Sequence, residues 1–488
     1  MKISLPSFGL FLGPLSFVLI LFFVEYPDLN QEALSMLALA TWMAIWWITE
    51  ALPIAATAFL PLIIMPTLKI LPISNVSANY MHPTVMLYMG GFLMATGIEK
   101  WNLHRRIALS IINLIGTDLR TIVLGFILAT GFLSMWISNS ATSLMMLPIG
   151  LAVVKQFQEQ LSGQKAGLSD RLSKNIMLGI AYSASIGGVA TLIGTPTNTI
   201  LAAVVKELYG YSIGFNEWLL FGFPLSVFLI GICWWYLVNF ANPLPKNYRL
   251  EEGKSIVKDQ LKKLGKMKFE EKTVLVVFAL VCFSWISRSF LLVKFIPGID
   301  DTIIVLSGVV ILFLLPDSTK TKRILDWKTA ESIPWGILIL FGGGLALAEG
   351  FKETGLAEWI GQRFTLIEGI SFFLLLLIIV AAVNFLTEVT SNVATASMLL
   401  PILASVALKL DLHPFGLMVG ATLAASCAFM LPVATPPNAV VFGSGYLKMN
   451  DMVKAGFWLN ILSILIVTVL VYFLLPSLWN IDLQANPF

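Results

Sequence analysis

A polar stretch occurs twice in this chain, and each copy lies between long apolar runs. Residues 134–149 read SMWISNSATSLMMLPI, and residues 387–402 read TEVTSNVATASMLLPI. Each copy has a companion downstream, IGTPTN at 193–198 and VATPPN at 433–438. Hydrocarbon tolerates an irregular backbone only where it is buried in protein or lines a cavity. Matched interruptions, one set in each half, therefore predict a transporter built from repeats, with its binding site at the interruptions.

Composition places the chain in a membrane. Of its 488 residues, 57% are hydrophobic and only 12% are charged, which is about half the charged fraction of a soluble domain. Long apolar runs favour membrane-spanning helices over barrel strands, which show short alternating segments. The net charge of +3 gives no argument for a nucleic-acid partner. We therefore expect an all-α polytopic membrane protein surrounded by membrane lipid, with no cofactor.

The apolar runs predict about eleven transmembrane helices and two re-entrant hairpins. The first run has no small-residue cleavage site after it, so we expect an uncleaved first span. A polar turn at the end of an apolar arm favours a hairpin that serves a cavity over two full crossings. The expected organisation is a first span with its extracytoplasmic loop at 1–33, a first repeat of spans 2–6 at 34–245 with a hairpin at 118–155, a basic cytoplasmic linker at 246–272, and a second repeat of spans 7–11 at 273–488 with a hairpin at 370–408.

Charge predicts the orientation. If the N-terminus is cytoplasmic and both hairpins return to their own side, 24 of the 31 Lys and Arg residues lie inside and seven lie outside. This distribution follows the positive-inside rule. Each repeat contains five crossings, and an odd number inverts the second copy, so we expect an inverted repeat whose two hairpin tips meet near the midplane. The expected location is the cell membrane, which is the inner membrane if the source is bacterial.

Two charged features allow more than one interpretation. The linker holds nine Lys and Arg residues against five acidic ones. Its apolar residues recur at near-helical spacing, which predicts a basic amphipathic helix on the membrane surface, although a plain solvated linker fits nearly as well. Glu50 lies at the break between spans 2 and 3. We prefer a helix-end contact near the interface to a buried proton carrier at this position.

The polar stretches carry groups that suit both an anion and a cation. The two tips begin half-helices, whose free N–H groups and dipoles attract anions. Asn139 and Asn392 add amide donors, and Ser140, Thr195 and Thr435 add hydroxyls. The four stretches contain no Lys or Arg, so an anion needs another charge balance, and hydroxyl and carbonyl oxygens suit Na⁺. The alternative is that these residues are only caps and kinks, which is weakened by two copies with matched flanks.

In order and spacing, these motifs resemble those of the divalent anion/sodium symporter family, whose members transport dicarboxylates, citrate or sulfate. The family's signatures are paired Ser-Asn-Thr hairpin tips, paired Gly/Ala-Thr-Pro motifs and a Thr-Glu-Ala-Leu-Pro segment after the second span. In this chain they read Ser138-Asn139-Ser140, Ser391-Asn392-Val393, Gly194-Thr195-Pro196, Ala434-Thr435-Pro436 and Thr49-Glu50-Ala51-Leu52-Pro53. The resemblance extends over nearly the whole chain.

The resemblance implies a homodimer that works as an elevator. Spans 1–4 and 7–9 would form the scaffold, and the hairpins with spans 5, 6, 10 and 11 would form the moving domain. One sodium site is implied at Ser134, Ser138, Asn139 and Gly194, and the other at Thr387, Ser391, Asn392 and Ala434. Substrate contacts are implied at Asn139, Ser140, Asn392, Thr435 and Pro436, and we add Thr195 and Val393 as candidates from the same motifs.

Two tip residues depart from the family pattern. Ser140 replaces Thr and keeps the hydroxyl, whereas Val393 replaces Thr and loses it. Because Val has nearly the shape of Thr, we expect the tip to pack normally while the site loses about 0.5–1.5 kcal/mol for one missing hydrogen bond. The departure therefore bears on the substrate more than on the cations.

We expect a sodium-coupled symporter of small di- or multivalent anions, above all C4-dicarboxylates such as succinate, malate and fumarate. Within transport, the alternative is an anion exchanger or a proton-coupled anion carrier on the same fold. An intramembrane enzyme is disfavoured because the tips contain no nucleophile–base pair and no nearby His. A channel is a further class, and it would show no saturable accumulation of the anion.

Overall fold

The computed structural model describes residues 5–26, 28–115, 118–160, 166–246, 253–363 and 369–487. Within these ranges the regular structure is helical, apart from one isolated bridge between Pro316 and Arg323. Eight helices are long and apolar enough to cross a membrane, and five shorter apolar segments accompany them. The expectation of an all-α polytopic membrane protein is confirmed at this level, whereas the count of eleven crossings stays a prediction.

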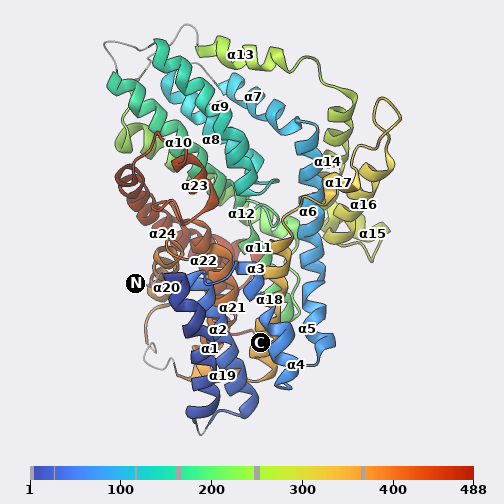
Figure 1. Cartoon of the computed structure of the whole chain (residues 1–488), viewed down its shortest axis with the longest axis vertical. Helices are drawn as coiled ribbons and strands as arrows, with labels where there is room; N and C mark the ends of the chain where they lie inside the picture. Colours follow the sequence, from blue (N-terminus) through green and yellow to red (C-terminus); the bar gives the residue numbers. More distant parts are fainter. Residues whose placement is uncertain are drawn as a thin grey trace.

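The first helices form the N-terminal part of the molecule. They are α1 (Leu5–Phe23), α2 (Gln31–Thr49), α3 (Ile54–Thr57), α4 (Leu60–Thr67), α5 (Ile73–Tyr80), α6 (Pro83–Lys100) and α7 (Leu103–Ile115). Helices α1 and α2 pack side by side near one end of the long axis (Figure 1). The third expected span is divided into the short helices α3 and α4. Pro53 lies just before α3 and Pro61 in the first turn of α4, where proline's missing N–H does no harm.

Two helices and a short connection occupy the range of the first expected hairpin. The arms are α8 (Leu119–Ser134) and α9 (Asn139–Gln160), and the tip lies between them. The single span expected next is two helices, α10 (Ala166–Gly188) and α11 (Pro196–Tyr209), because the GTPTN motif interrupts it. Then come α12 (Phe215–Tyr236) and a π-helical turn, η1 (Leu237–Ala241).

The second half repeats this order. Its helices are α13 (Gly253–Lys263), α14 (Phe269–Ser287), η2 (Arg288–Leu292), α15 (Val293–Phe295), α16 (Asp301–Leu314), α17 (Trp327–Ala330), α18 (Trp335–Glu353), α19 (Leu356–Gln362), α20 (Phe372–Thr387), α21 (Asn392–Lys409), α22 (Pro414–Ser426), α23 (Pro436–Phe442) and α24 (Met449–Trp479). The second hairpin is α20 with α21, and VATPPN separates α22 from α23. Helix α24 follows as α12 does in the first half.

Packing repeats between the halves as well. Helix α10 packs against both arms of the first hairpin, and α22 packs against both arms of the second. The halves also exchange contacts, because α9 packs against α23 and α21 packs against α11. Each hairpin therefore meets the half-helix that begins at the Thr-Pro motif of the other half. This exchange brings four motif regions into one part of the molecule.

The linker helix is present as α13, near the end of the long axis opposite α1 and α2 (Figure 1). Its apolar residue Val257 is buried, and Leu261 and Leu264 pack against the main core. Helix α13 lies against α7 and α9, and Arg105 of α7 donates to Gln260 over 3.2 Å. The apolar side that predicted membrane contact therefore packs against protein.

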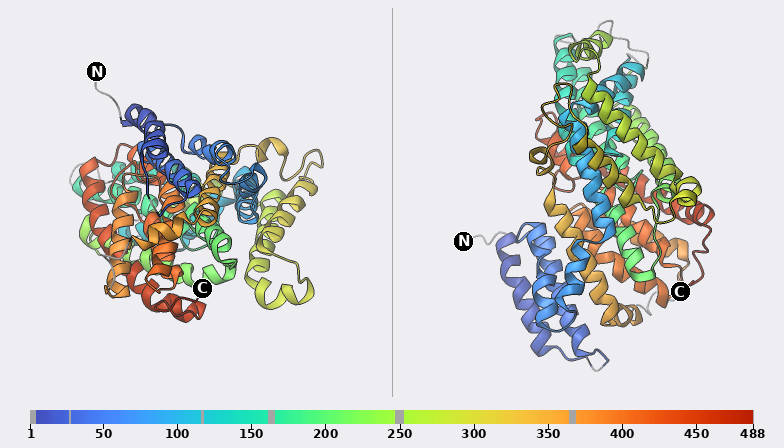
Figure 2. Two further views of the ribbon diagram at one scale, coloured as in Figure 1. Left: turned by 90° about the horizontal axis from the view of Figure 1, so that it is seen from below. Right: turned by 90° about the vertical axis from the view of Figure 1, so that its right-hand side faces the viewer.

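Two features at the margin of the molecule were not predicted from the sequence. The basic segment after the fourth span is helical as α7, and α19 occupies the matching place after α18. Helices α14 and α16 pack together and project from the body of the molecule in two perpendicular views (Figures 1 and 2). Projection of apolar helices leaves their outer surface open to lipid.

Candidate functional site

All four motifs coincide with helix N-termini. Helices α9 and α21 begin at the tip residues Asn139 and Asn392. Helices α11 and α23 begin at Pro196 and Pro436, just after the threonines of the Thr-Pro motifs. Proline is favoured at the first helical position because the N–H it lacks would be unpaired there. Each start presents unpaired N–H groups and the positive end of a helix dipole.

Oxygen atoms converge beside the first tip. The Ser134 hydroxyl, which is fully buried, lies 2.7 Å from Asn139 Oδ1 and 2.6 Å from the carbonyl oxygen of Ala184. The carbonyl of Gly194 lies at 3.2 Å from the same end of the Asn139 amide. Ala184 lies in the last turns of α10, which ends at Gly188, and Gly194 lies in the non-helical segment before α11. We call Ser134, Asn139, Ala184 and Gly194 the first oxygen cluster.

The Asn139 amide fits the first oxygen cluster in two orientations. With its nitrogen inward, the amide donates to Ser134 Oγ at 2.7 Å, Ala184 O at 3.1 Å and Gly194 O at 3.2 Å. With its oxygen inward, four oxygen atoms face one another. The Ser134 hydroxyl is the only donor among them and can satisfy one neighbouring oxygen, so the remaining lone pairs face one another, and hard cations favour such a ligand set. The first oxygen cluster therefore fits Na⁺ in one amide orientation and closes on itself in the other.

The second tip has a similar arrangement of three oxygen atoms. The buried Thr387 hydroxyl lies 2.7 Å from Asn392 Oδ1 and 3.2 Å from the carbonyl oxygen of Ala425, at the end of α22. We call Thr387, Asn392 and Ala425 the second oxygen cluster. Ala434, the fourth residue expected at this site, is buried. It lies in the non-helical segment between α22 and α23, which we call the second chain break.

The non-helical segment between α10 and α11 is the first chain break. In each chain break, an asparagine side chain donates hydrogen bonds to backbone carbonyls. Asn198 Nδ2 donates to the carbonyls of Gly188, Val189 and Thr191 at 2.8–3.3 Å. Asn438 Nδ2 donates to the carbonyls of Ala428 and Leu431 at 3.2 and 3.0 Å. Non-helical backbone inside apolar surroundings needs such partners. The final Asn of each Thr-Pro motif is thus the residue that makes the break stable.

The remaining predicted site residues have varied surroundings. Ser138 accepts a hydrogen bond from the Ala141 N–H over 3.3 Å and so caps α9, and Ser391 is the N-cap residue of α21. The Thr435 hydroxyl caps α23 by accepting from the Asn438 N–H, and Pro436 beside it is exposed. Ser140 and Val393 are half-buried. These residues share the tip and break regions, and their direct contact with an anion stays a prediction.

Hydroxyl groups join the two halves near the breaks. Thr195 Oγ1 lies 3.4 Å from Thr197 Oγ1, which in turn lies 2.6 Å from Ser426 Oγ at the end of α22. All three side chains are buried. Thr195 therefore belongs to a polar link between α11 and α22, in addition to its place in the predicted substrate site.

Sequence reasoning missed three contributors. Ala184 and Ala425 contribute through backbone carbonyls, which no side chain marks in the sequence. Glu388, directly after Thr387, is buried and binds the second chain break. The available signal was an acidic residue inside an apolar run, which in membrane proteins points to function.

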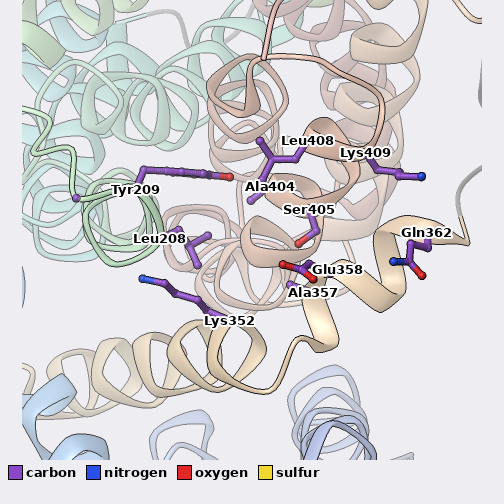
Figure 3. Close-up of a pocket in the computed structure, with 11 residues that line it drawn as sticks. Leu208, Tyr209, Lys352, Ala357, Glu358, Gln362, Ala404, Ser405, Leu408 and Lys409 are labelled. Carbon is purple, nitrogen blue, oxygen red and sulfur yellow. The ribbon is translucent and has the colours of Figure 1, made fainter. Parts of the chain in front are cut away.

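Several pockets lie among the described helices, and two of them involve residues of the second hairpin. A pocket of about 720 Å³ lies between the C-terminal ends of α11, α18 and α21 and helix α19, where Lys352, Glu358 and Lys409 line it (Figure 3). A smaller pocket of about 210 Å³ brings Glu50 beside Val389 and Thr390 of the second hairpin. Glu50 is exposed and ends α2 in the left-handed conformation, which agrees with the preferred helix-end interpretation.

The chain is similar to curated transporters over most of its length. It is 46% identical over 481 residues to the sodium-dependent dicarboxylate transporter SdcS of Staphylococcus saprophyticus, covering 97% of this chain and 92% of the relative. It is 45% identical over 483 residues to the transporter of the same name in Staphylococcus aureus, covering 98% and 92%.

Solved structures support the fold. The Alcanivorax borkumensis YdaH transporter superposes with a TM-score of 0.58 at 13% identity, covering 90% of this chain and 99% of that one. Neisseria gonorrhoeae MtrF superposes with a TM-score of 0.51 at 11% identity, covering 82% and 83%. The model of the sodium:sulfate symporter transmembrane region matches residues 8–480. The chain therefore belongs to the sodium:sulfate symporter family.

Proposed function

We propose that this protein is a secondary transporter that moves a small dianion, foremost a C4-dicarboxylate, into the cell together with Na⁺. The observation that carries the proposal is the pair of oxygen clusters, one beside each hairpin tip. Each joins a buried hydroxyl, a tip asparagine and a helix-end carbonyl. Family membership and relatives named sodium-dependent dicarboxylate transporters support the same function.

Coupling between Na⁺ and the anion follows from the amide of each tip asparagine, whose oxygen suits a cation and whose nitrogen suits an anion. When Na⁺ occupies an oxygen cluster, the amide oxygen of Asn139 or Asn392 turns toward the cation, and the amide nitrogen is released as a donor. A carboxylate then finds amide N–H groups and helix N-termini in place of an amide oxygen that would repel it. Without Na⁺, the Asn139 nitrogen closes its own cluster. Cation binding therefore precedes and favours anion binding.

Charge balance requires the cations. The tips and Thr-Pro motifs contain no Lys or Arg, and a dianion in a buried site is costly unless opposite charge accompanies it. One Na⁺ in each oxygen cluster would neutralise one dicarboxylate. Uptake is then expected to rise more than linearly with Na⁺ concentration. The groups at the tips do not require a coupling ion other than Na⁺.

The moving parts are proposed from the repeated architecture. The hairpins with α10–α12 and α22–α24 would move as one domain against a scaffold built from α1–α6 and α14–α18. The exchanged packing of α9 with α23 and α21 with α11 supports a single moving body. A homodimer, an inverted second repeat and a cytoplasmic N-terminus complete the proposal, as the sequence predicts.

Counterflow and uptake measurements in liposomes test the substrate and the transport class. Purified protein should take up labelled succinate when Na⁺ is outside, and unlabelled malate and fumarate should compete with it. An exchanger would need a dicarboxylate inside the liposomes, and a proton-coupled carrier would work in K⁺ buffer with a pH gradient. Either of those results, without a sodium requirement, would contradict sodium-coupled symport.

A further inference from the structure

A buried carboxylate lies beside the second oxygen cluster. Glu388 follows Thr387 at the end of α20, and only 3% of its surface is exposed. Its Oε1 accepts from the N–H groups of Phe429 at 2.7 Å and Met430 at 2.9 Å, and its Oε2 accepts from Leu431 N–H at 2.9 Å. Asn460 Nδ2 of α24 adds a fourth donor at 2.7 Å.

Three successive N–H groups that converge on one acceptor form a nest for an anion. Here the nest is the chain break between α22 and α23, and its anion is a side chain of the same half. The four donors compensate for removing the carboxylate from water. Glu388 therefore fixes the N–H side of the break, while Asn438 holds the carbonyls of Ala428 and Leu431.

The first half lacks this carboxylate. Met135 follows Ser134, where Glu388 follows Thr387. The corresponding N–H groups of Val189 and Ala190 donate to carbonyls of their own turn, those of Ile186 and Gly187. The first break is tied to its hairpin by the Thr191 hydroxyl, which donates to the Met135 carbonyl at 2.5 Å.

The chain break is longer in the second half, where Glu388 is present, than in the first. Helix α10 runs to Gly188, ten residues before Asn198, whereas α22 stops at Ser426, twelve residues before Asn438. The Phe429 and Met430 N–H groups that would close a turn are bound to Glu388 instead. The carbonyl facing the tip hydroxyl also shifts by one residue.

From this asymmetry we propose that Glu388 is a positioning residue for the second oxygen cluster and makes it the tighter and first-filled of the two sodium sites. The inference rests on the proposed function, in which both oxygen clusters bind Na⁺. Glu388 acts in two ways. It holds the break open so that helix-end carbonyls face Thr387, and it places a carboxylate beside the cluster, whose field attracts a cation through a medium of low dielectric constant.

Sodium binding without substrate tests the proposal directly. Thermal unfolding of the purified full-length protein would be followed as NaCl replaces choline chloride at constant ionic strength. Glu388→Gln keeps the shape of the side chain, removes the carboxylate and brings an amide nitrogen against N–H donors. It should raise the Na⁺ concentration for half-maximal stabilisation about tenfold or more. At saturating Na⁺, the succinate KM should stay within about threefold, because Glu388 is not assigned a substrate contact.

A matched control uses the same substitution elsewhere. Glu349 of α18 is a half-buried carboxylate that accepts from Asn79 at 2.6 Å, in a different part of the fold. Glu349→Gln should leave half-maximal stabilisation by Na⁺ within about twofold of the wild type. An equal effect of the two substitutions would show that Na⁺ binding responds to the loss of a carboxylate elsewhere in the fold as well, and would overturn the proposal.

A second pair of variants tests the ranking of the two sodium sites even if Glu388→Gln does not fold. Thr387→Ala and Ser134→Ala each remove one tip hydroxyl. The tighter site predicts that Thr387→Ala raises half-maximal Na⁺ at least threefold more than Ser134→Ala. Equal shifts, or a larger shift for Ser134→Ala, would overturn the ranking. If Na⁺ does not stabilise even the wild type, the proposed function fails with it, whereas unchanged binding in Glu388→Gln rejects only the role of Glu388.

Discussion

The two tip asparagines have the most demanding roles of any single residues. Each lies 2.7 Å from a buried hydroxyl through its amide, and each begins a half-helix. The sequence alone identified both, because Ser-Asn recurs with matched flanks. It could not identify the partners Ala184 and Ala425, since a backbone carbonyl becomes available only where the helix ends. Helix ends depend on tertiary contacts such as those of Glu388 and Asn198.

Removing either tip amide should abolish transport. In Asn139→Ala and Asn392→Ala, the cluster loses an oxygen ligand and the anion loses a donor, so we expect succinate uptake to fall at least about 100-fold, or roughly 3 kcal/mol for two lost polar contacts. Uptake into liposomes measures this, normalised to inserted protein. Asn75→Ala, at an exposed position of α5, is the matched control. Normal uptake by both tip variants would make the tips structural caps only.

Val393 tests which chemical group the second tip presents to the substrate. Restoring the hydroxyl in Val393→Thr adds one donor with little change of volume, so the affinity for C4-dicarboxylates should rise a few-fold, as about one hydrogen bond allows. If the substrate places an apolar edge there, the unpaired hydroxyl should weaken binding instead. Competition by succinate, malate, citrate and sulfate distinguishes these outcomes. If Val393→Thr changes neither the ranking of the four anions nor the affinity for any of them, residue 393 does not face the substrate.

At the scale of elements, close packing at the first chain break explains why residues 188 and 194 are glycines. A side chain on Gly188 would overlap the Asn139 side-chain oxygen, and one on Gly194 would overlap the Gly188 carbonyl. The breaks and hairpins were predictable because proline and polar residues interrupt apolar runs. Helix α7 was not, because its charged residues were interpreted only as a basic connection. The packing of α13 on α7 was also hidden, since periodicity identifies an apolar face but not what covers it.

Gly188→Ala should therefore disable the first oxygen cluster. The new methyl group displaces the Asn139 amide, so half-maximal stabilisation by Na⁺ should require at least about tenfold more Na⁺, a loss of about 1.4 kcal/mol. Gly231→Ala is the control, because its added methyl group meets no neighbouring atom within 4 Å. Sodium titration of thermal unfolding compares the two. Equal sodium affinity in both variants would show that the Gly188 contact does not shape a cation site.

An ion pair connects the end of α6 with the N-terminus of α17. Lys100 Nζ lies 2.6 Å from Asp326 Oδ2, and this hydrogen bond, together with those from the Thr329 N–H and hydroxyl, lowers the pKa of Asp326 to about 2. A lowered pKa in the folded state stabilises the protein above the unfolded pKa of about 3.9, and the stabilisation is lost as pH falls toward 2. The pair is partly exposed, so it contributes at most about 1 kcal/mol.

Thermal unfolding as a function of pH checks this contribution. At pH 7 the wild type should unfold at a slightly higher temperature than Asp326→Asn. The difference should shrink as the pH falls from about 4 toward 2, because the carboxylate is then progressively protonated. A difference that stays constant across this range would show that the charge of the Asp326 carboxylate does not account for the effect of the substitution.

At the scale of the whole molecule, the exchanged contacts mean that neither half forms the site alone. Helix α9 of the first half meets α23 of the second, and α21 meets α11. The outer helices fit a lipid environment, because Val276, Leu280 and Phe283 form an exposed stripe on α14 with 57%, 58% and 60% of their surfaces accessible. The all-helical membrane architecture was predictable from the apolar runs, whereas the repeats, their inversion, dimerisation and elevator motion stay predictions.

The most direct test of the account is the accumulation of succinate against its own gradient. Liposomes containing the protein would hold equal labelled succinate inside and outside, at one pH, with Na⁺ outside and choline inside. Sodium-coupled symport predicts that internal succinate rises well above the external concentration and returns to it when the sodium gradient is dissipated. Equal concentrations throughout, or accumulation that persists without Na⁺, would contradict sodium-coupled symport.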